Sequence, residues 1–148
     1  MSTARIDAAG VRHTRVNRVW SMGFNTCHAA LVLRDDLNRH LQMARDTGFR
    51  YIRFHNVFSE QVGLYSETDD GSPVYDFSNF DTIFDAIISH GLLPFFEISF
   101  CPPALKSGDT TITHYHANTS LPASMEKWSE LVRTTVQHVV ERYGIESV

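Results

Sequence analysis

Apolar side chains recur at helical spacing in three stretches of the sequence. Each stretch would place one apolar stripe on a helix face, so we expect helices between residues 35 and 48, 78 and 91, and 124 and 144. Ser78, followed by Asp81, and Ser124 are the expected N-cap signals. Each stretch ends at a glycine, the residue that best tolerates a left-handed C-cap: Gly48, Gly91 and Gly144.

Short apolar runs of a different kind lie between these helices. Residues 49–54 and 92–100 are aromatic or β-branched and nearly continuously apolar, as in strands that are covered on both faces. Residues 19–24 form a less apolar first strand. Strand and helix therefore alternate three times, which predicts a parallel α/β sheet.

The end of the sequence leaves two architectures open. After the third helix, residues 145–148 resemble the approach to a fourth strand. One interpretation is the first three βα units of a (β/α)8 TIM-type barrel, which needs about 250 residues when complete. The other is a small three-stranded α/β domain that is complete in itself.

Composition narrows the class of protein. The chain has 148 residues, which suits one domain, and 43% of them are hydrophobic. Its 13 Lys and Arg residues are scattered and the net charge is -4, so we expect no nucleic-acid partner. No apolar run approaches the roughly 20 residues that span a bilayer, and the polar N-terminus has no signal-peptide pattern. We therefore expect a cytoplasmic protein that does not bind membranes.

The candidate chemistry lies at the ends of the predicted strands. Side chains in a strand alternate between faces, so Arg53 and His55 share one face of the second strand, and Glu97 lies on the corresponding face of the next. Arg53 and Glu97 are expected to form a buried ion pair, because a buried charge needs a partner. That pair either fixes the core alone or forms the polar floor of a pocket. His55, at the strand tip, is expected to contact a ligand.

The segments that follow the strands, residues 56–77 and 101–124, are long, as functional loops are. Their aromatic and imidazole side chains are candidate walls of a sugar site or ordinary packing: Tyr65, Tyr75, His114, Tyr115 and His116.

Other chemistries receive little support from the residues. His114 and His116 form a His-x-His pair without a convincing third ligand, so we expect no metal, and no nucleotide-binding loop or other cofactor motif is present. Cys27 next to His28 is a poor nucleophile pair, because adjacent residues point apart. Glu97 alone does not make a glycosidase site, which usually needs two carboxylates.

Several segments, in order, resemble glycoside hydrolase family 39, which contains β-xylosidases and α-L-iduronidases. The central segment of this resemblance is Gly48-Phe49-Arg50-Tyr51-Ile52-Arg53-Phe54-His55. Further matches fall at Cys27-His28-Ala29-Ala30, Pro73-Val74-Tyr75-Asp76-Phe77, Gly91-Leu92-Leu93-Pro94-Phe95-Phe96-Glu97, Lys106-Ser107-Gly108-Asp109, Glu126-Lys127-Trp128 and Glu141-Arg142-Tyr143-Gly144. The resemblance implies a (β/α)8 barrel and retaining hydrolysis of glycosides, with β-xylosides favoured.

The same resemblance implies which residues act. His55 contacts the sugar in the subsite for the non-reducing end, and Arg53 and Glu97 shape that pocket. Trp20 and His28 are further substrate-binding positions by the same resemblance. The family's acid/base glutamate follows an asparagine at the end of strand four, and its nucleophile lies at the end of strand seven. The sequence contains no Asn-Glu dipeptide, so no catalytic residue is assigned.

We therefore expect residues 1–15 to be an N-terminal extension and residues 16–148 to be the N-terminal part of a barrel, inactive alone. The alternatives are a non-catalytic sugar-sensing module, for example of a transcription regulator, and a structural α/β domain related by descent only. The expected partner is a xyloside-type sugar. Open sheet edges would also favour self-association.

Overall fold

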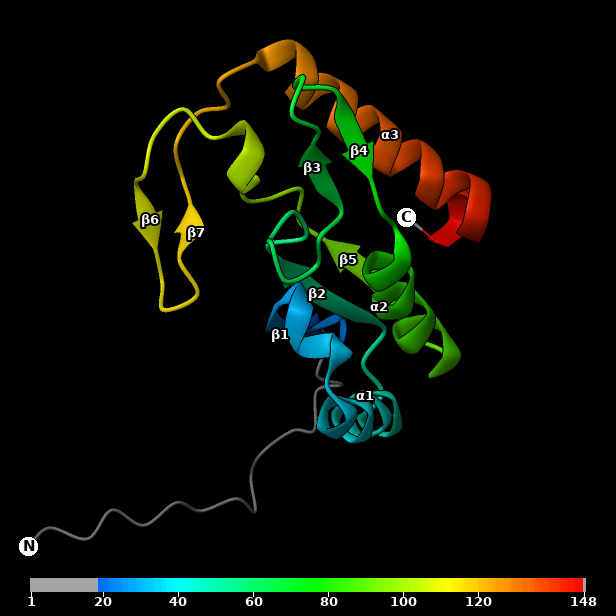
Figure 1. Cartoon of the computed structure of the whole chain (residues 1–148). Helices are drawn as coiled ribbons and strands as arrows, with labels where there is room; N and C mark the ends of the chain where they lie inside the picture. The colour runs from blue at the N-terminus through cyan, green and yellow to red at the C-terminus, as the bar shows by residue number, and fades with distance from the viewer. Residues whose placement is uncertain (1–18, 148) are drawn as a thin grey trace, which may run out of the picture.

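The computed structural model describes residues 19–147, which form an α/β unit around a parallel three-stranded sheet (Figure 1). The strand order is β1-β2-β5, with all neighbours parallel. The strands are β1 (Gly23–His28), β2 (Tyr51–His55) and β5 (Leu93–Phe96). The helices are α1 (Asp35–Thr47), α2 (Ser78–Ser89) and α3 (Met125–Tyr143). The predicted alternation of parallel βα units is confirmed.

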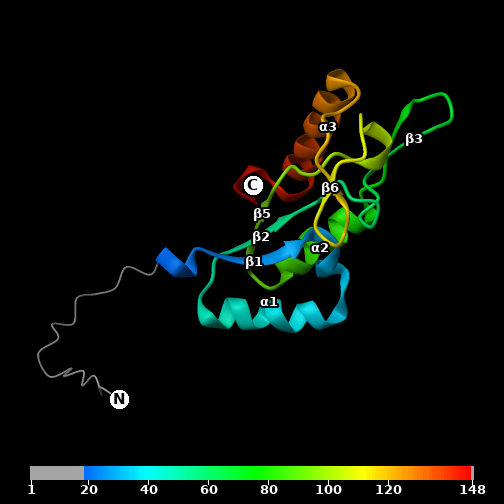
Figure 2. The ribbon, with the colours of Figure 1, turned by 90° about the vertical axis from the view of Figure 1, so that its left-hand side faces the viewer.

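The two faces of the sheet differ sharply. Ile52 and Phe54 are fully buried on one face of the sheet. Helices α1 and α2 cover that face, and Figure 2 shows both helices on the same side of the strands. The phenyl ring of Phe84 in α2 lies 6.0 Å from that of Phe54 and 4.5 Å from that of Phe80. Apolar side chains in α1 and α2 therefore form the core because their helical spacing aims them at the sheet.

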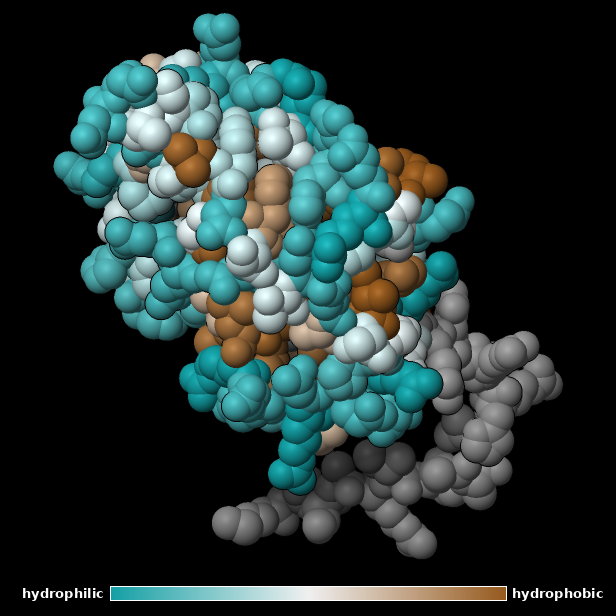
Figure 3. Space-filling view, turned by 45° about the vertical axis from the view of Figure 1, so that its right-hand side comes forward, coloured by the Kyte–Doolittle hydropathy of each residue, from teal (hydrophilic) through white to brown (hydrophobic). Residues whose placement is uncertain are grey.

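The other face, called here the inner face, is open. Arg53 is exposed there, and Phe95 is 56% exposed. A shallow pocket of about 520 Å³ lies on this face beside Phe95. Its lining residues are Met22, Gly23, Tyr51, Arg53, Pro94 and Phe95. Figure 3 brings the right-hand side of Figure 1 forward, and the surface seen there is mostly hydrophilic, with apolar groups interspersed.

A polar network docks α3 against α2. His138 Nε2 lies 2.7 Å from Asp81 Oδ1, and the Tyr143 hydroxyl donates to the same carboxylate at 3.1 Å. The His138 ring also stacks on Phe77 at 3.7 Å between centroids. This contact fixes α3, and with it the end of the segment that follows β5.

The first strand was predicted in the wrong place. Residues Val19–Ser21 form a 3-10 turn, and β1 begins only at Gly23. Asn25 and Thr26 make the true strand look polar, although Thr26 is buried and its hydroxyl donates to the Arg53 carbonyl at 3.4 Å. The register with β2 is irregular between Asn25 and His28, where Cys27 has a φ of 73°.

The predicted helix ends need smaller corrections. Ser124 caps α3 and accepts from the Lys127 N–H, and Gly48 is the left-handed C-cap of α1, both as predicted. Ser78 is the first residue of α2 and not its cap, because Phe77 occupies the N-cap position; Asp76 Oδ1 accepts the Ser78 N–H at 2.9 Å. Gly144 has a positive φ of 83° but an extended ψ of 155°, so it leaves the helix without the left-handed conformation.

Both long segments after the strands contain a hairpin. The segment after β2 holds β3 (Tyr65–Glu67) and β4 (Pro73–Tyr75). The segment after β5 holds the 3-10 turn η3 (Pro103–Leu105), then β6 (Thr111–Ile112) and β7 (Ala117–Asn118). The predicted N-terminal extension, residues 1–15, lies outside the described residues. No helix of the described residues is long and apolar enough to cross a membrane.

Candidate functional site

Polar side chains meet where the parallel strands end. His28 closes β1 and His55 closes β2, and the two residues are register partners. Glu97 directly follows β5, where its backbone N–H donates to the Phe54 carbonyl at 2.9 Å. The C-terminal ends of parallel strands are where α/β proteins carry their functional groups. His28, His55, Arg53 and Glu97 are here called the strand-end cluster.

Arg53 and Glu97 form an ion pair on the inner face, through Arg53 Nη2 and Glu97 Oε1. The alternation of strand side chains predicted this pairing. The predicted burial was wrong: the two side chains are 45% and 35% exposed, because the inner face is open in the described part of the chain. An exposed pair of this kind stabilises the fold by at most about 1 kcal/mol, so its main effect is to place two charged groups on the inner face.

Tyr115 completes the strand-end cluster from a distant part of the sequence. It lies at the tip of the β6–β7 hairpin, and its hydroxyl oxygen is 2.6 Å from Nε2 of His55. Its ring lies 4.5 Å from the His28 ring, tilted by 35°. The sequence identified Tyr115 only as one of several possible wall residues, because its approach to His55 depends on how the hairpin folds back.

Burial sets the electrostatics of the two histidines. His28 is 7% exposed, and its Nδ1 has no hydrogen-bond partner among residues 19–147. Burial lowers the pKa of His28, and the nearby His55 and His114 lower it further. Burial also lowers the pKa of His55, where Glu97 opposes the shift and Arg53 adds to it. Both imidazoles are therefore held neutral at physiological pH.

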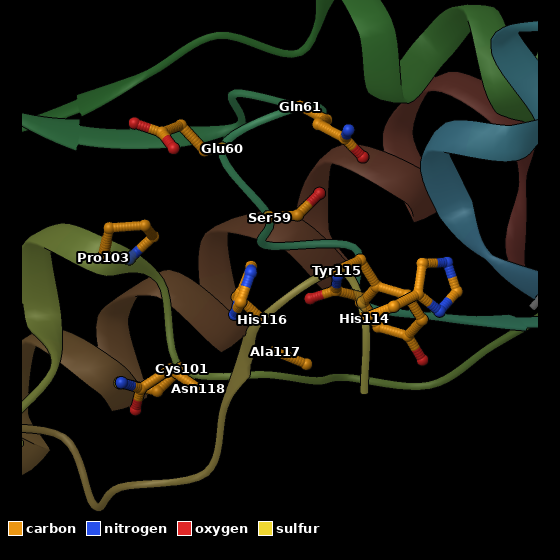
Figure 4. A pocket seen from close by; sticks show the side chains of 11 residues that line it. Ser59, Glu60, Gln61, Cys101, Pro103, His114, Tyr115, His116, Ala117 and Asn118 are labelled. Carbon is orange, nitrogen blue, oxygen red and sulfur yellow. The ribbon is translucent and has the colours of Figure 1, made fainter. Parts of the chain in front are cut away.

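A pocket of about 340 Å³ opens beside Tyr115, as Figure 4 shows in close-up. The loop after β2 contributes Ser59 and Glu60 to one side, and Pro103, Cys101 and His116 lie on the other. Glu60 is a carboxylate that sequence reasoning did not place at the site. No strand or helix pattern marks it, because it lies in an irregular loop. The pocket offers hydroxyl, amide, carboxylate and imidazole groups, which suit a polyhydroxylated ligand.

Other predicted site residues lie elsewhere. Trp20 precedes β1 and packs edge-on against Phe49 at 5.8 Å, at the end of the sheet opposite His28 and His55. Tyr65 is buried and its hydroxyl donates to Glu67 at 2.7 Å, while its ring packs on Tyr75 at 5.7 Å. The structure thus brings together four of the five predicted substrate-binding residues and places Trp20 apart.

The lowered pKa values predict acid sensitivity. Between the folded-state pKa and the ordinary value near 6.5, the unfolded chain binds protons that buried His28 and half-buried His55 do not. Stability should therefore be full above pH 6.5 and fall as pH drops below it, by at most about 1.4 kcal/mol per pH unit for each histidine. Urea unfolding between pH 7.5 and 5.5 measures this slope. His28→Gln should reduce it, and an unchanged slope in that variant would contradict the assignment.

The fold and the cluster define a class: an α/β protein of parallel βα units with polar side chains gathered at the C-terminal ends of the strands. The comparisons with known proteins then specify it. The family model for glycosyl hydrolases family 39 matches residues 4–148. A β-xylosidase of Caldicellulosiruptor saccharolyticus is 38% identical over 136 residues, and one of Geobacillus stearothermophilus is 38% identical over 133. The chain belongs to glycosyl hydrolase family 39.

Solved structures agree with this membership. The family 39 enzyme from Xanthomonas axonopodis pv. citri matches 90% of the chain with a TM-score of 0.82 and 36% identity. A monomeric β-xylosidase from Caulobacter crescentus CB15 also matches 90% of the chain, with a TM-score of 0.83 and 36% identity. The chain spans only 26–27% of those two structures. The first relative above is matched over 91% of this chain and 28% of its own length, and the second over 87% and 26%.

Proposed function

We propose that this chain supplies the first βα units of a (β/α)8 glycoside hydrolase barrel acting on β-xylosides, and that its own role is to bind the sugar. The observation that carries the proposal is the strand-end cluster in a family 39 chain. His28, His55 and the Arg53–Glu97 pair gather at the C-terminal ends of the three strands. The names of two relatives, both β-xylosidases, support the choice of substrate.

Within this role the chain's residues bind and orient rather than cleave. An imidazole and a guanidinium–carboxylate pair can each hydrogen-bond sugar hydroxyls. Retaining hydrolysis needs two carboxylates about 5–5.5 Å apart, one as nucleophile and one as acid/base. Glu97 already has Arg53 as its partner, and the sequence lacks the Asn-Glu pair of the family's acid/base position. We assign no catalytic residue to this chain.

A non-catalytic sugar-sensing module is the second candidate, because the strand-end cluster could bind a sugar in either role. The two candidates make the same prediction for this chain and differ only for a longer protein. Catalytic glutamates in a longer protein would favour the hydrolase, whereas a fused DNA-binding domain would favour the sensor.

The experiment uses an aryl β-xyloside, whose binding and cleavage are read in one sample. We expect saturable binding, detected by chemical-shift changes, and no release of the aryl group. His55→Ala should weaken binding by tenfold or more, because it removes a hydrogen bond and opens the site, at about 1.4 kcal/mol per factor of ten. His40→Ala, an exposed imidazole on α1, is the matched control and should bind as the unaltered chain does.

A further inference from the structure

Tyr115 contacts the ends of both β1 and β2. Its hydroxyl oxygen lies 2.6 Å from Nε2 of His55 at the end of β2. The Tyr115 ring packs against the His28 ring at the end of β1. The His114 ring stands edge-on to the Tyr115 ring, with 5.0 Å between their centroids. The contact to His55 spans 60 positions of sequence, so it depends on a fixed hairpin position.

The base of that hairpin is firmly anchored. Asn118 is buried, and its side-chain amide donates to the Gly108 carbonyl at 2.7 Å. The Cys101 N–H donates to the Asn118 carbonyl at 3.1 Å, which ties the hairpin to the segment leaving β5. Ala117 is also buried. Tyr115 therefore meets His55 from a defined direction.

The direction of the hydrogen bond follows from the acidities of the two groups. A phenol is a much stronger acid than the N–H of a neutral imidazole, so the Tyr115 hydroxyl donates and Nε2 accepts. The ring proton of neutral His55 must then lie on Nδ1, because the hydrogen bond to one nitrogen fixes the tautomer. His55 is only half-buried and its one hydrogen bond among the described residues is through Nε2, so the Nδ1–H is the donor that it would offer to a ligand.

We propose that Tyr115 is a positioning residue that orients the imidazole of His55 and holds it as the Nδ1–H tautomer, so that His55 presents one hydrogen-bond donor to a sugar hydroxyl. That the ligand is a sugar rests on the proposed function. The tautomer itself is a property of the chain without ligand. Besides Tyr115 itself, the charged and titratable groups around His55 are Glu97, Arg53 and His28.

The competing role for Tyr115 is packing alone, through its ring on His28. Removing only the hydroxyl separates the two roles, because phenylalanine keeps the ring contact. Tyr115→Phe is therefore the informative variant. Tyr75→Phe is its matched control: Tyr75 lies in the other hairpin, and its hydroxyl has no hydrogen-bond partner in residues 19–147.

The test is ¹⁵N NMR of the imidazole nitrogens in the full chain without sugar, with His55→Gln used to assign the His55 resonances. We expect Nε2 of His55 to resonate as an unprotonated nitrogen in the unaltered chain and in Tyr75→Phe. In Tyr115→Phe it should move towards the protonated range, since free imidazole prefers the Nε2–H form. The pKa of His55 should rise by roughly half a unit to one unit, because the neutral form loses its bond.

A protonated Nε2 in the unaltered chain, or nitrogen shifts unaffected by Tyr115→Phe, would overturn the proposal. Neither result would bear on sugar binding, because no sugar is present. Conversely, a chain that fails to bind the aryl β-xyloside but shows the expected tautomer would refute the proposed function and leave the role of Tyr115 in orienting His55 intact.

Discussion

Phe84→Ala is expected to lower the free energy of unfolding by about 3–5 kcal/mol, the range for deleting a large side chain from a packed core. Phe84 is fully buried and lies where four elements meet. From α2 its ring contacts Phe54 of β2, Phe96 of β5 at 5.3 Å and Tyr143 of α3 at 5.2 Å. Urea unfolding followed by circular dichroism measures the loss.

Phe95→Ala is the matched control, since it deletes the same side chain from the inner face of β5. Phe95 is 56% exposed, so little apolar surface is lost and the change should cost less than about 1 kcal/mol at low protein concentration. Equal losses in the two variants would contradict the assignment of the covered and open faces of the sheet. Such a result would also undermine the placement of Arg53 and His55 on the open face.

Self-association through the inner face is the second large effect we expect. β1 and β5 are the edge strands of the sheet and carry unpaired backbone groups, and the apolar pocket beside Phe95 lies between them. Sedimentation velocity should show association that increases with concentration. Phe95→Lys should weaken it by roughly tenfold or more, because a lysine ammonium would have to be desolvated in the contact.

Leu121→Lys provides the comparison for that result. Leu121 is 77% exposed in the segment before α3 and lies outside the inner-face pocket, so its replacement should leave association unchanged. A chain that sediments as a sharp monomer at all concentrations, or equal effects of the two lysine variants, would rule out the inner face as the contact.

The helices were predictable because their apolar stripes are long and their caps are chemically distinct. Ser124 and Gly48 mark helix ends at which a side-chain oxygen or a left-handed residue is needed. The first strand was not predictable from the same signal. Thr26 is buried in β1 while Asn25 is exposed, so tertiary position, and not apolar pattern, determines where that strand lies.

The strand-borne part of the site was predictable from a period of two. Once β2 and β5 are adjacent and parallel, Arg53, His55 and Glu97 must lie on one face of the sheet near the C-terminal ends of the strands. Tyr115 was beyond that reasoning, because its contact with His55 depends on a hairpin turn with positive φ at Thr113 and His116. Trp20 was assigned by the resemblance alone, and it lies at the opposite end of the sheet from the strand-end cluster.

The aryl β-xyloside measurement tests most directly the claim that these residues bind a sugar without cleaving it. The account predicts saturable binding with no aryl release, tenfold or greater weakening in His55→Ala, and no change in His40→Ala. Aryl release that disappears in His55→Ala would contradict it, because the chemistry would then be complete within this chain. Equal binding by the unaltered chain and His55→Ala would contradict the placement of the sugar at the strand-end cluster.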